Sequence, residues 1–340
     1  MDRHRSRREV LRTGTAVATI GVTSALSGCQ GAIRRVVDGD QSDSIETVRK
    51  WTPAPPGDAS ESDRTPAMFP VKYRQPKTLA KVDDRTDTRL TSGPRYLFNR
   101  WIWALPIQYS EVPYVLYVGP TTGLFRYDHD PSEPPLTSGD FQKQSEYRGF
   151  EVYASGSGDG GDADSSGGSG SEVIYAFDGT HVVRSRRDWP ADSDSKPLFE
   201  LVIDAHDGAV GRYVEGDDHV EAMLRATNPG DLLDLSRGGT VSPFGDLRGE
   251  KRLDRHVGYC LSGRYGSTVA EFQLLVDFET SDEADVATVK RFVEAHRDDE
   301  YGFRGADNFA YRRLDHMVEV TFRIPLEAFQ GPSPPPDIRR

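Results

Sequence analysis

The chain has 340 residues, a length that suits one large domain or two of modest size. Its 54 Asp and Glu residues outnumber its 42 Lys and Arg residues, so the formal net charge is −12, which argues against a nucleic-acid partner held by phosphate neutralisation. Hydrophobic residues make up 36% of the chain and aromatic residues 10%, which is enough to pack a core and excludes a wholly disordered protein.

The charged residues are biased in kind as well as in sign. The chain contains 35 Asp and 19 Glu, but its 42 basic residues divide into 34 Arg and only 8 Lys. This bias resembles the surfaces of proteins from extreme halophiles. Carboxylates hold water and cations, whereas long lysine side chains add apolar area that high salt drives together. The composition therefore favours a halophilic protein over one with an ordinary acidic surface.

The N-terminus begins with an arginine-rich segment, followed by an uncharged stretch at residues 13–28. This stretch is too short and too polar to span a membrane, which takes about 20 predominantly apolar residues. Within the basic segment, Arg7 and Arg8 stand just ahead of Leu11, an arrangement that resembles the twin-arginine (Tat) export signal. The resemblance implies that residues 1–28 are a Tat lipoprotein signal peptide and that the Tat translocase is a partner during export.

The uncharged stretch ends in Leu26, Ser27 and Gly28, directly before Cys29. This tetrapeptide resembles a lipobox. The resemblance implies that a diglyceride-type lipid alkylates the thiol of Cys29, that cleavage makes Cys29 the mature N-terminus, and that a two-chain lipid holds the protein stably on the membrane. We therefore expect an anchored protein on the extracytoplasmic face of the cell membrane. The alternative is an N-terminal helix with a buried cysteine.

Residues 29–66 are rich in Asp, Ser, Pro and Gly and show little apolar periodicity. This composition predicts a flexible, lipidated tether. Trp51 is the exception, because a large aromatic side chain of this kind can dock on a folded domain.

A first α+β block is predicted over residues 67–236. Strands are expected at residues 112–119 and 147–153, and residues 171–186 have the pattern of a hairpin that turns at Asp178 and Gly179. The glycine, serine and aspartate run at residues 154–171 predicts a disordered loop.

Two helices are expected later in this block. The first runs from a cap at Ser195 to a stop at Gly208, and a hairpin through residues 207–208 is the competing interpretation. The second has an apolar face within residues 217–230 and ends at a proline-glycine pair.

A second block is predicted over residues 245–330, with the order β-β-α-β-β and a helix capped by Ser281. Residues 331–340 are proline-rich and should be frayed. Because the strands come in pairs with helices between them, the expected fold class is α+β, with antiparallel sheets and a few helices after the signal and tether.

The sequence contains no defensible catalytic motif: it lacks Gly-x-Ser-x-Gly, His-Glu-x-x-His, paired Cys-x-x-Cys and a P-loop. We therefore predict no enzyme activity and no cofactor. Cys260 could be a nucleophile aided by His256, but a cysteine packed in the core of a strand is favoured. The aromatic run at residues 96–109 is expected to be core, with a ligand groove as the alternative.

Two short clusters pair carboxylates with histidine and are weak candidates for metal binding. The first is expected in a loop, and the second opens a helix, where acids complement the helix dipole. In both cases an ordinary structural role is favoured. The six residues are Asp128, His129, Asp130, Asp217, Asp218 and His219.

The whole chain resembles twin-arginine-exported lipoproteins of halophilic archaea, through the signal at residues 6–29, the Asp/Lys bias and the hairpin-plus-helix units. The resemblance implies a sorting route and no particular activity. The leading hypothesis is a non-catalytic, lipid-anchored binding or structural module whose protein or small-molecule partner the sequence does not identify. The alternatives are an extracytoplasmic solute-binding lipoprotein of a transporter and a metal-dependent hydrolase.

Overall fold

The computed structural model describes residues 44–55, 69–86, 104–119, 121–127, 136, 141–155, 172–186, 196–238, 253, 255–297 and 303–329. The chain divides after Gly39 into two units, and every described residue belongs to the second, Asp40–Arg340. The Tat motif, the lipobox and Cys29 therefore lie outside the described residues, as do the expected loop from residue 156 onward and the C-terminal tail.

The described elements are strands and short helices. In chain order they are α1 (Ser44–Trp51), β1 (Val71–Arg74), α2 (Pro76–Thr86), η1 (Tyr109–Glu111), β2 (Val115–Val118), β3 (Thr122–Arg126), β4 (Phe141–Tyr147), β5 (Phe150–Ser155), β6 (Val173–Phe177), β7 (His181–Arg186), α4 (Leu198–Asp207), α5 (Tyr213–Gly216), α6 (Asp218–Ala226), β8 (Leu232–Arg237), β9 (His256–Tyr265), β10 (Val269–Phe278), α7 (Val286–Ala295), β11 (Asp307–Leu314), β12 (Met317–Pro325) and η3 (Leu326–Phe329).

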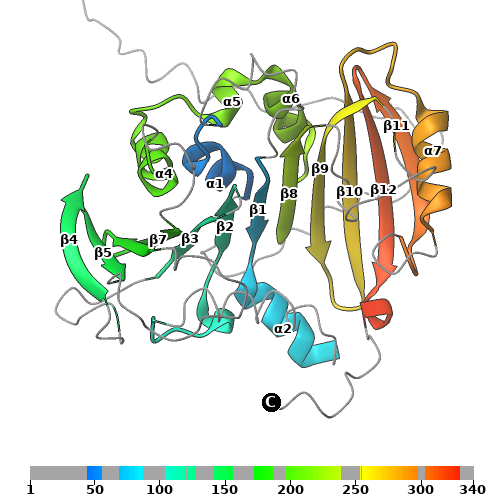
Figure 1. Ribbon diagram of the computed structural model, residues 1–340. Coiled ribbons are helices and arrows are strands. Elements are labelled where there is room, and N and C mark those ends of the chain that lie inside the picture. The colour runs from blue at the N-terminus through cyan, green and yellow to red at the C-terminus, as the bar shows by residue number, and fades with distance from the viewer. Residues whose placement is uncertain are drawn as a thin grey trace, which may run out of the picture. The chain divides into compact units, whose positions relative to one another are not determined.

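The strands form one twelve-stranded sheet in the order β11-β12-β10-β9-β8-β1-β2-β3-β7-β6-β5-β4 (Figure 1). Each described strand pair is antiparallel, for example β8 with β9, where Leu235 lies opposite Cys260. The α+β class with antiparallel strands is thus confirmed. The two expected β-rich blocks share this sheet, because β8 from the first block lies between β1 and β9.

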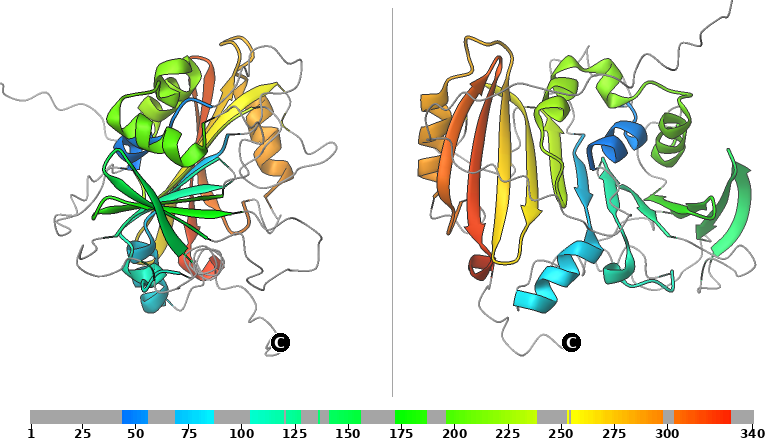
Figure 2. Two further views of the ribbon diagram at one scale, coloured as in Figure 1. Left: turned by 60° about the vertical axis from the view of Figure 1, so that its left-hand side comes forward. Right: turned by 180° about the vertical axis from the view of Figure 1, so that it is seen from behind.

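The two faces of the sheet carry separate apolar clusters, because side chains alternate along each strand. In β10, Leu275 belongs to a cluster shared with Met223 of α6, whereas Leu274 and Val276 belong to a cluster shared with Val289 of α7. Helices α6 and α7 therefore cover opposite faces, as Figure 2 shows. Burial of these alternating apolar residues is what fixes the register of the strands.

The tether predicted over residues 29–66 is wrong for residues 44–55. Residues 44–51 form α1, and Val48 and Trp51 are 1% and 3% exposed in the core. The Trp51 ring lies 3.8 Å from the His206 ring, measured between centroids. The chain continues along α5, where the Tyr213 N–H donates to the Thr52 carbonyl oxygen at 3.0 Å. Docking of Trp51 is thus confirmed, and residues 44–55 belong to the folded part because their apolar side chains find a partner surface.

Two further local expectations need correction. The single strand expected at residues 147–153 is a tight hairpin, because Arg148 (φ 49°) and Gly149 (φ 82°) form the turn between β4 and β5. Two positive φ angles suit the twist of a two-residue turn, and the period-two pattern hides this reversal. The α7 cap is Asp285 and not Ser281, because the Asp285 carboxylate accepts from the N–H groups of the first helical turn.

The expected hairpin at residues 171–186 is confirmed as β6 and β7, which are joined through Asp178 and Gly179. The helical interpretation of residues 198–207 is also confirmed, because α4 ends at Gly208 in the left-handed conformation (φ 73°). The cap of α4 is Pro197, and Ser195 lies outside the described ranges. The β-β-α-β-β order of the second block is confirmed as β9, β10, α7, β11 and β12.

Candidate functional site

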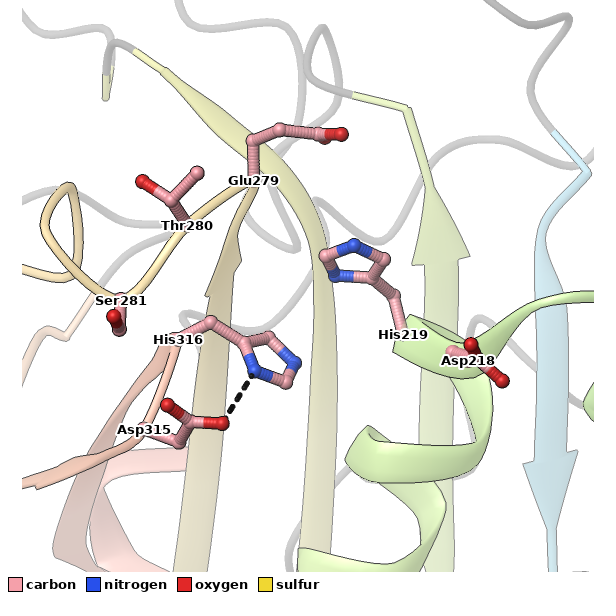
Figure 3. Close-up of a pocket in the computed structure, with 7 residues that line it drawn as sticks. All are labelled: Asp218, His219, Glu279, Thr280, Ser281, Asp315 and His316. Atoms are coloured by element: carbon pink, nitrogen blue, oxygen red, sulfur yellow. Dashed lines mark hydrogen bonds and ion pairs between the residues drawn. The ribbon is translucent and has the colours of Figure 1, made fainter.

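Three side chains with metal-ligating atoms converge at one end of the sheet. They are His219, Asp277 and His316, and their ligand atoms all lie within 4.8 Å of one another. His219 lies in the first turn of α6, and Asp277 is the second-last residue of β10. His316 lies in the turn between β11 and β12. Figure 3 shows the imidazoles of His219 and His316 on either side of a pocket.

His219 is held in place by the way α6 begins. The Asp217 carboxylate caps the helix, because its Oδ1 accepts from the N–H groups of His219 at 3.0 Å and Val220 at 3.1 Å. This is the side-chain-to-backbone bond that satisfies the otherwise unpaired N–H groups of a first helical turn. The sequence candidate Asp217 is therefore a helix cap, which leaves the His219 side chain available to the pocket.

Asp277 and His316 meet through the pairing of β10 with β12, in which Asp277 lies opposite Met317. A register shift between Asp277 and Phe278 marks a bulge at the end of β10. Bulges of this kind re-aim side chains at sheet ends. Directly after the bulge, the Phe278 N–H donates to the His316 carbonyl oxygen at 3.0 Å, so the turn that carries His316 is tied to β10.

Asp277 forms the floor of the cluster and has no exposed surface. Its Oδ2 lies 2.9 Å from His219 Nδ1, and its Oδ1 lies 3.4 Å from His316 Nε2. Neither Asp277 Oδ1 nor His316 Nε2 has a hydrogen-bond partner among the described residues, although both atoms are buried. Burial, which outweighs the attraction of Arg237, raises the pKa of the Asp277 carboxyl to about 8.

Arg237 reaches the site from β8. Its Nε donates to Asp217 Oδ2 at 3.1 Å and its Nη1 donates to the Val257 carbonyl oxygen at 3.0 Å, whereas Nη1 is 3.9 Å from Asp277 Oδ2. Burial lowers the pKa of His219, and its electrostatic interactions with Arg237 and His316 lower it further. A neutral imidazole is the form that offers a lone pair to a cation.

The pocket beside the cluster has a volume of about 200 Å³. All seven lining residues are polar and three of them are acidic, and the side chains of both histidines are 21% exposed. It is lined by Asp218, His219, Glu279, Thr280, Ser281, Asp315 and His316 (Figure 3). A pocket of this size and character suits a small polar ligand or an ion.

The sequence candidates thus have different outcomes. His219 belongs to the cluster, Asp218 lines the pocket and Asp217 caps the helix. The other expected cluster, residues 128–130, lies outside the described residues. Sequence reasoning missed Asp277 and His316, whose only local signals are an acidic residue at a strand end and an Asp-His pair in a turn.

Cys260 is a core residue of β9, as favoured from the sequence. It is 1% exposed, and Thr227 Oγ1 donates to its Sγ at 3.2 Å. Burial raises the pKa of the Cys260 thiol to about 12, which keeps the sulfur protonated and unreactive. His256 is also buried, and its Nδ1 lies 2.7 Å from the Leu253 carbonyl oxygen. The nucleophile hypothesis therefore finds no support in the geometry.

The aromatic run expected at residues 96–109 is described only from Ala104 onward. Ala104, Leu105 and Tyr109 are buried in the cluster that packs against β2, β3, β6 and β7. This part of the run is core, as expected by default.

Among the described residues, no helix has the length and apolar character needed to cross a membrane. In comparisons with known proteins, no family model, no curated protein and no solved structure matches this chain.

Proposed function

We propose that this chain is a lipid-anchored protein on the extracytoplasmic face of the membrane and that it acts as a binding module through the pocket beside His219 and His316. The location is supported by the Tat-like arginine pair and by the lipobox that ends at Cys29. The binding role is supported by one observation above all: three polar side chains from distant parts of the chain meet at a solvent-open pocket.

The anchor is tested by replacing Cys29 and following the protein in cell fractions. In Cys29→Ser the lipid has no attachment atom, so we expect the full-length precursor to accumulate unprocessed or the protein to leave the membrane fraction. Cys260→Ala is the matched control, because it removes the other thiol of the chain without touching the lipobox. Membrane retention and processing equal to those of the wild type would contradict the anchor.

The export route is tested separately through the arginine pair. Arg7→Lys combined with Arg8→Lys keeps the positive charge of the segment but removes the paired guanidinium groups that the Tat signal resembles. The protein should then stay inside the cell. Normal export of this variant would point to a different route.

A metal-dependent hydrolase is the second candidate function. The observation that favours it is the convergence of two imidazoles and one carboxylate at a pocket that solvent reaches, because catalytic metal sites keep an open coordination position. Hydrolysis of model esters by the full chain that EDTA and His316→Gln both abolish would favour the enzyme. Ligand binding without turnover would favour the binding module.

The solute-binding lipoprotein has weaker support. The feature expected of it is a deep cleft between two α/β lobes, whereas the described strands form one antiparallel sheet.

A further inference from the structure

We propose that His219, Asp277 and His316 bind one divalent transition-metal ion, with Zn²⁺ as the representative species. This inference deepens the proposed function, since it names the ligand of the same pocket. It does not depend on the lipid anchor or on the export route. The ion would take the place of the proton shared by His219 Nδ1 and Asp277 Oδ2, which is released to solvent, and would be held by Nδ1 of His219, a carboxylate oxygen of Asp277 and Nε2 of His316.

Two buried atoms of the cluster have no hydrogen-bond partner among the described residues. Asp277 Oδ1 and His316 Nε2 face each other at 3.4 Å, and neither has a hydrogen bond within the described parts of the chain. Buried polar atoms are nearly always satisfied, so two such atoms side by side call for a group that accepts electron pairs from both. A cation between the two atoms would accept an electron pair from each. Without a cation, both atoms are buried away from water and make no hydrogen bond within the described parts of the chain.

The donor atoms of the three side chains lie close enough together to share one ion. With metal–ligand bonds of about 2.0–2.1 Å, neighbouring donors of a tetrahedral site lie roughly 3.3 Å apart. His219 Nδ1 lies 2.9 Å from Asp277 Oδ2, and His316 Nε2 lies 3.4 Å from the other oxygen of that carboxylate, Oδ1. All three donor atoms lie within 4.8 Å of one another, so a small inward rotation of the two imidazoles completes the site.

His316 is oriented by a carboxylate in its own turn. Its Nδ1 lies 3.2 Å from Asp315 Oδ2 in the same turn. A carboxylate beside one ring nitrogen accepts a hydrogen bond from the N–H at that position. The hydrogen therefore stays on that nitrogen, and the lone pair is on the other nitrogen. Histidines that bind metals are commonly oriented by such an outer carboxylate. Asp315 is thus a positioning residue that directs His316 Nε2 toward Asp277, and the tautomer follows from this hydrogen bond.

The local charge and the chemical nature of the donor atoms both suit a transition-metal cation. Five acidic side chains surround the site. Two guanidinium groups of the described residues also reach it, but each is already shared: that of Arg237 donates to the Asp217 side chain and the Val257 carbonyl oxygen, and that of Arg313 donates to the carbonyl oxygens of Ser281 and Asp315. The excess of negative charge favours a cation. Mg²⁺ and Ca²⁺ prefer all-oxygen sites, whereas two imidazoles and a carboxylate suit Zn²⁺ and its transition-metal neighbours. The five acids are Asp217, Asp218, Asp277, Glu279 and Asp315.

The site leaves one side of the ion open. Asp277 is fully buried beneath, while His219 and His316 flank the pocket with their rings 4.9 Å apart at 78°. The direction opposite the carboxylate therefore faces the pocket, where water or a further ligand can reach the ion. Three protein ligands with an open fourth position are typical of exchangeable and catalytic metal sites and not of closed structural ones.

The test is calorimetric titration of the full chain, purified in detergent micelles, kept in molar KCl and stripped of metal with EDTA that is then removed. ZnCl₂ should bind with a stoichiometry of one, and MgCl₂ in the same buffer should give no binding heat. His219→Gln and His316→Gln should each weaken Zn²⁺ binding at least tenfold. Both side chains are partly exposed, so these variants are expected to fold, which circular dichroism checks. His181→Gln is the matched control, because it removes a similarly exposed imidazole from β7, outside the pocket, and it should retain the wild-type affinity.

A second readout separates the positioning residue from a general loss of structure. Asp315→Asn should weaken Zn²⁺ binding by roughly tenfold, as losses of outer carboxylates do, while the urea midpoint of the metal-free protein stays unchanged. No Zn²⁺ binding by a folded wild-type chain would overturn the metal site, as would binding that persists unchanged in both histidine variants. Neither result would alter the membrane fractionation, so failure of this inference and failure of the anchor are distinguishable.

Discussion

Replacing Trp51 with alanine tests whether α1 belongs to the core. The side chain is 3% exposed and packs on the rings of His206 and His181, at 3.8 and 5.0 Å between centroids. A tryptophan buries about 200 Å², which at about 25 cal/mol per Å² gives an upper value of about 5 kcal/mol. Because a real unfolded chain is partly compact, we expect Trp51→Ala to lower the free energy of unfolding by about 3–4 kcal/mol.

The assay is equilibrium unfolding of the full chain in urea at molar salt, followed by far-ultraviolet circular dichroism so that loss of the indole does not alter the signal. Lys50→Ala is the control from the same helix, because Lys50 is exposed and its loss should change stability by no more than about 0.5 kcal/mol. If Trp51→Ala destabilises the protein no more than Lys50→Ala does, α1 is not part of the core and the tether extends through it.

Two further predictions concern buried polar groups. Asp204 is fully buried, and although burial raises the pKa of its carboxyl, hydrogen bonds from Lys196 (2.6 Å) and Tyr147 (2.8 Å) outweigh burial and lower it. A carboxyl with a lowered pKa contributes stability above its unfolded pKa, and that stability is lost on acidification. Asp204→Asn should therefore lower the free energy of unfolding by about 1–3 kcal/mol near pH 7. The fall in the urea midpoint between about pH 5 and pH 3 should also be flatter in this variant. An unchanged acid limb in this variant would show that other carboxyls control it. The Cys260 thiol, with its raised pKa, should resist a maleimide in the native protein and react in urea, as mass spectrometry of its peptide would show; rapid native labelling would contradict its burial.

Much of the fold could be predicted from local pattern. The strands β9 and β10 alternate apolar side chains toward two faces, and α4 ends at a glycine that adopts the left-handed conformation the stop requires. These features depend on neighbours in the sequence. The turn at Arg148 and Gly149 was missed because the residues on either side of it keep the same alternation.

The helix α1 shows a different limit. Its surroundings are rich in Pro, Asp and Ser, so composition indicates a tether. What makes residues 44–51 helical and ordered is the apolar surface around Val48 and Trp51, formed with α4 and α5 far along the chain. Tertiary packing of an apolar face, more than local propensity, stabilises short helices of this kind.

By itself, the sequence determined the α+β class, most strands of the second block and the presence of a histidine with acidic neighbours at residues 217–219. Tertiary structure alone decided that His219 meets Asp277 and His316, which are 58 and 97 positions away. The physical reason is the antiparallel register: Asp277 opposite Met317 brings the β11–β12 turn to the end of β10, and the packing of α6 on the same face brings His219 over both. Contacts of this kind have no signature in any short window, because they depend on which strands pair and on which face each side chain is buried.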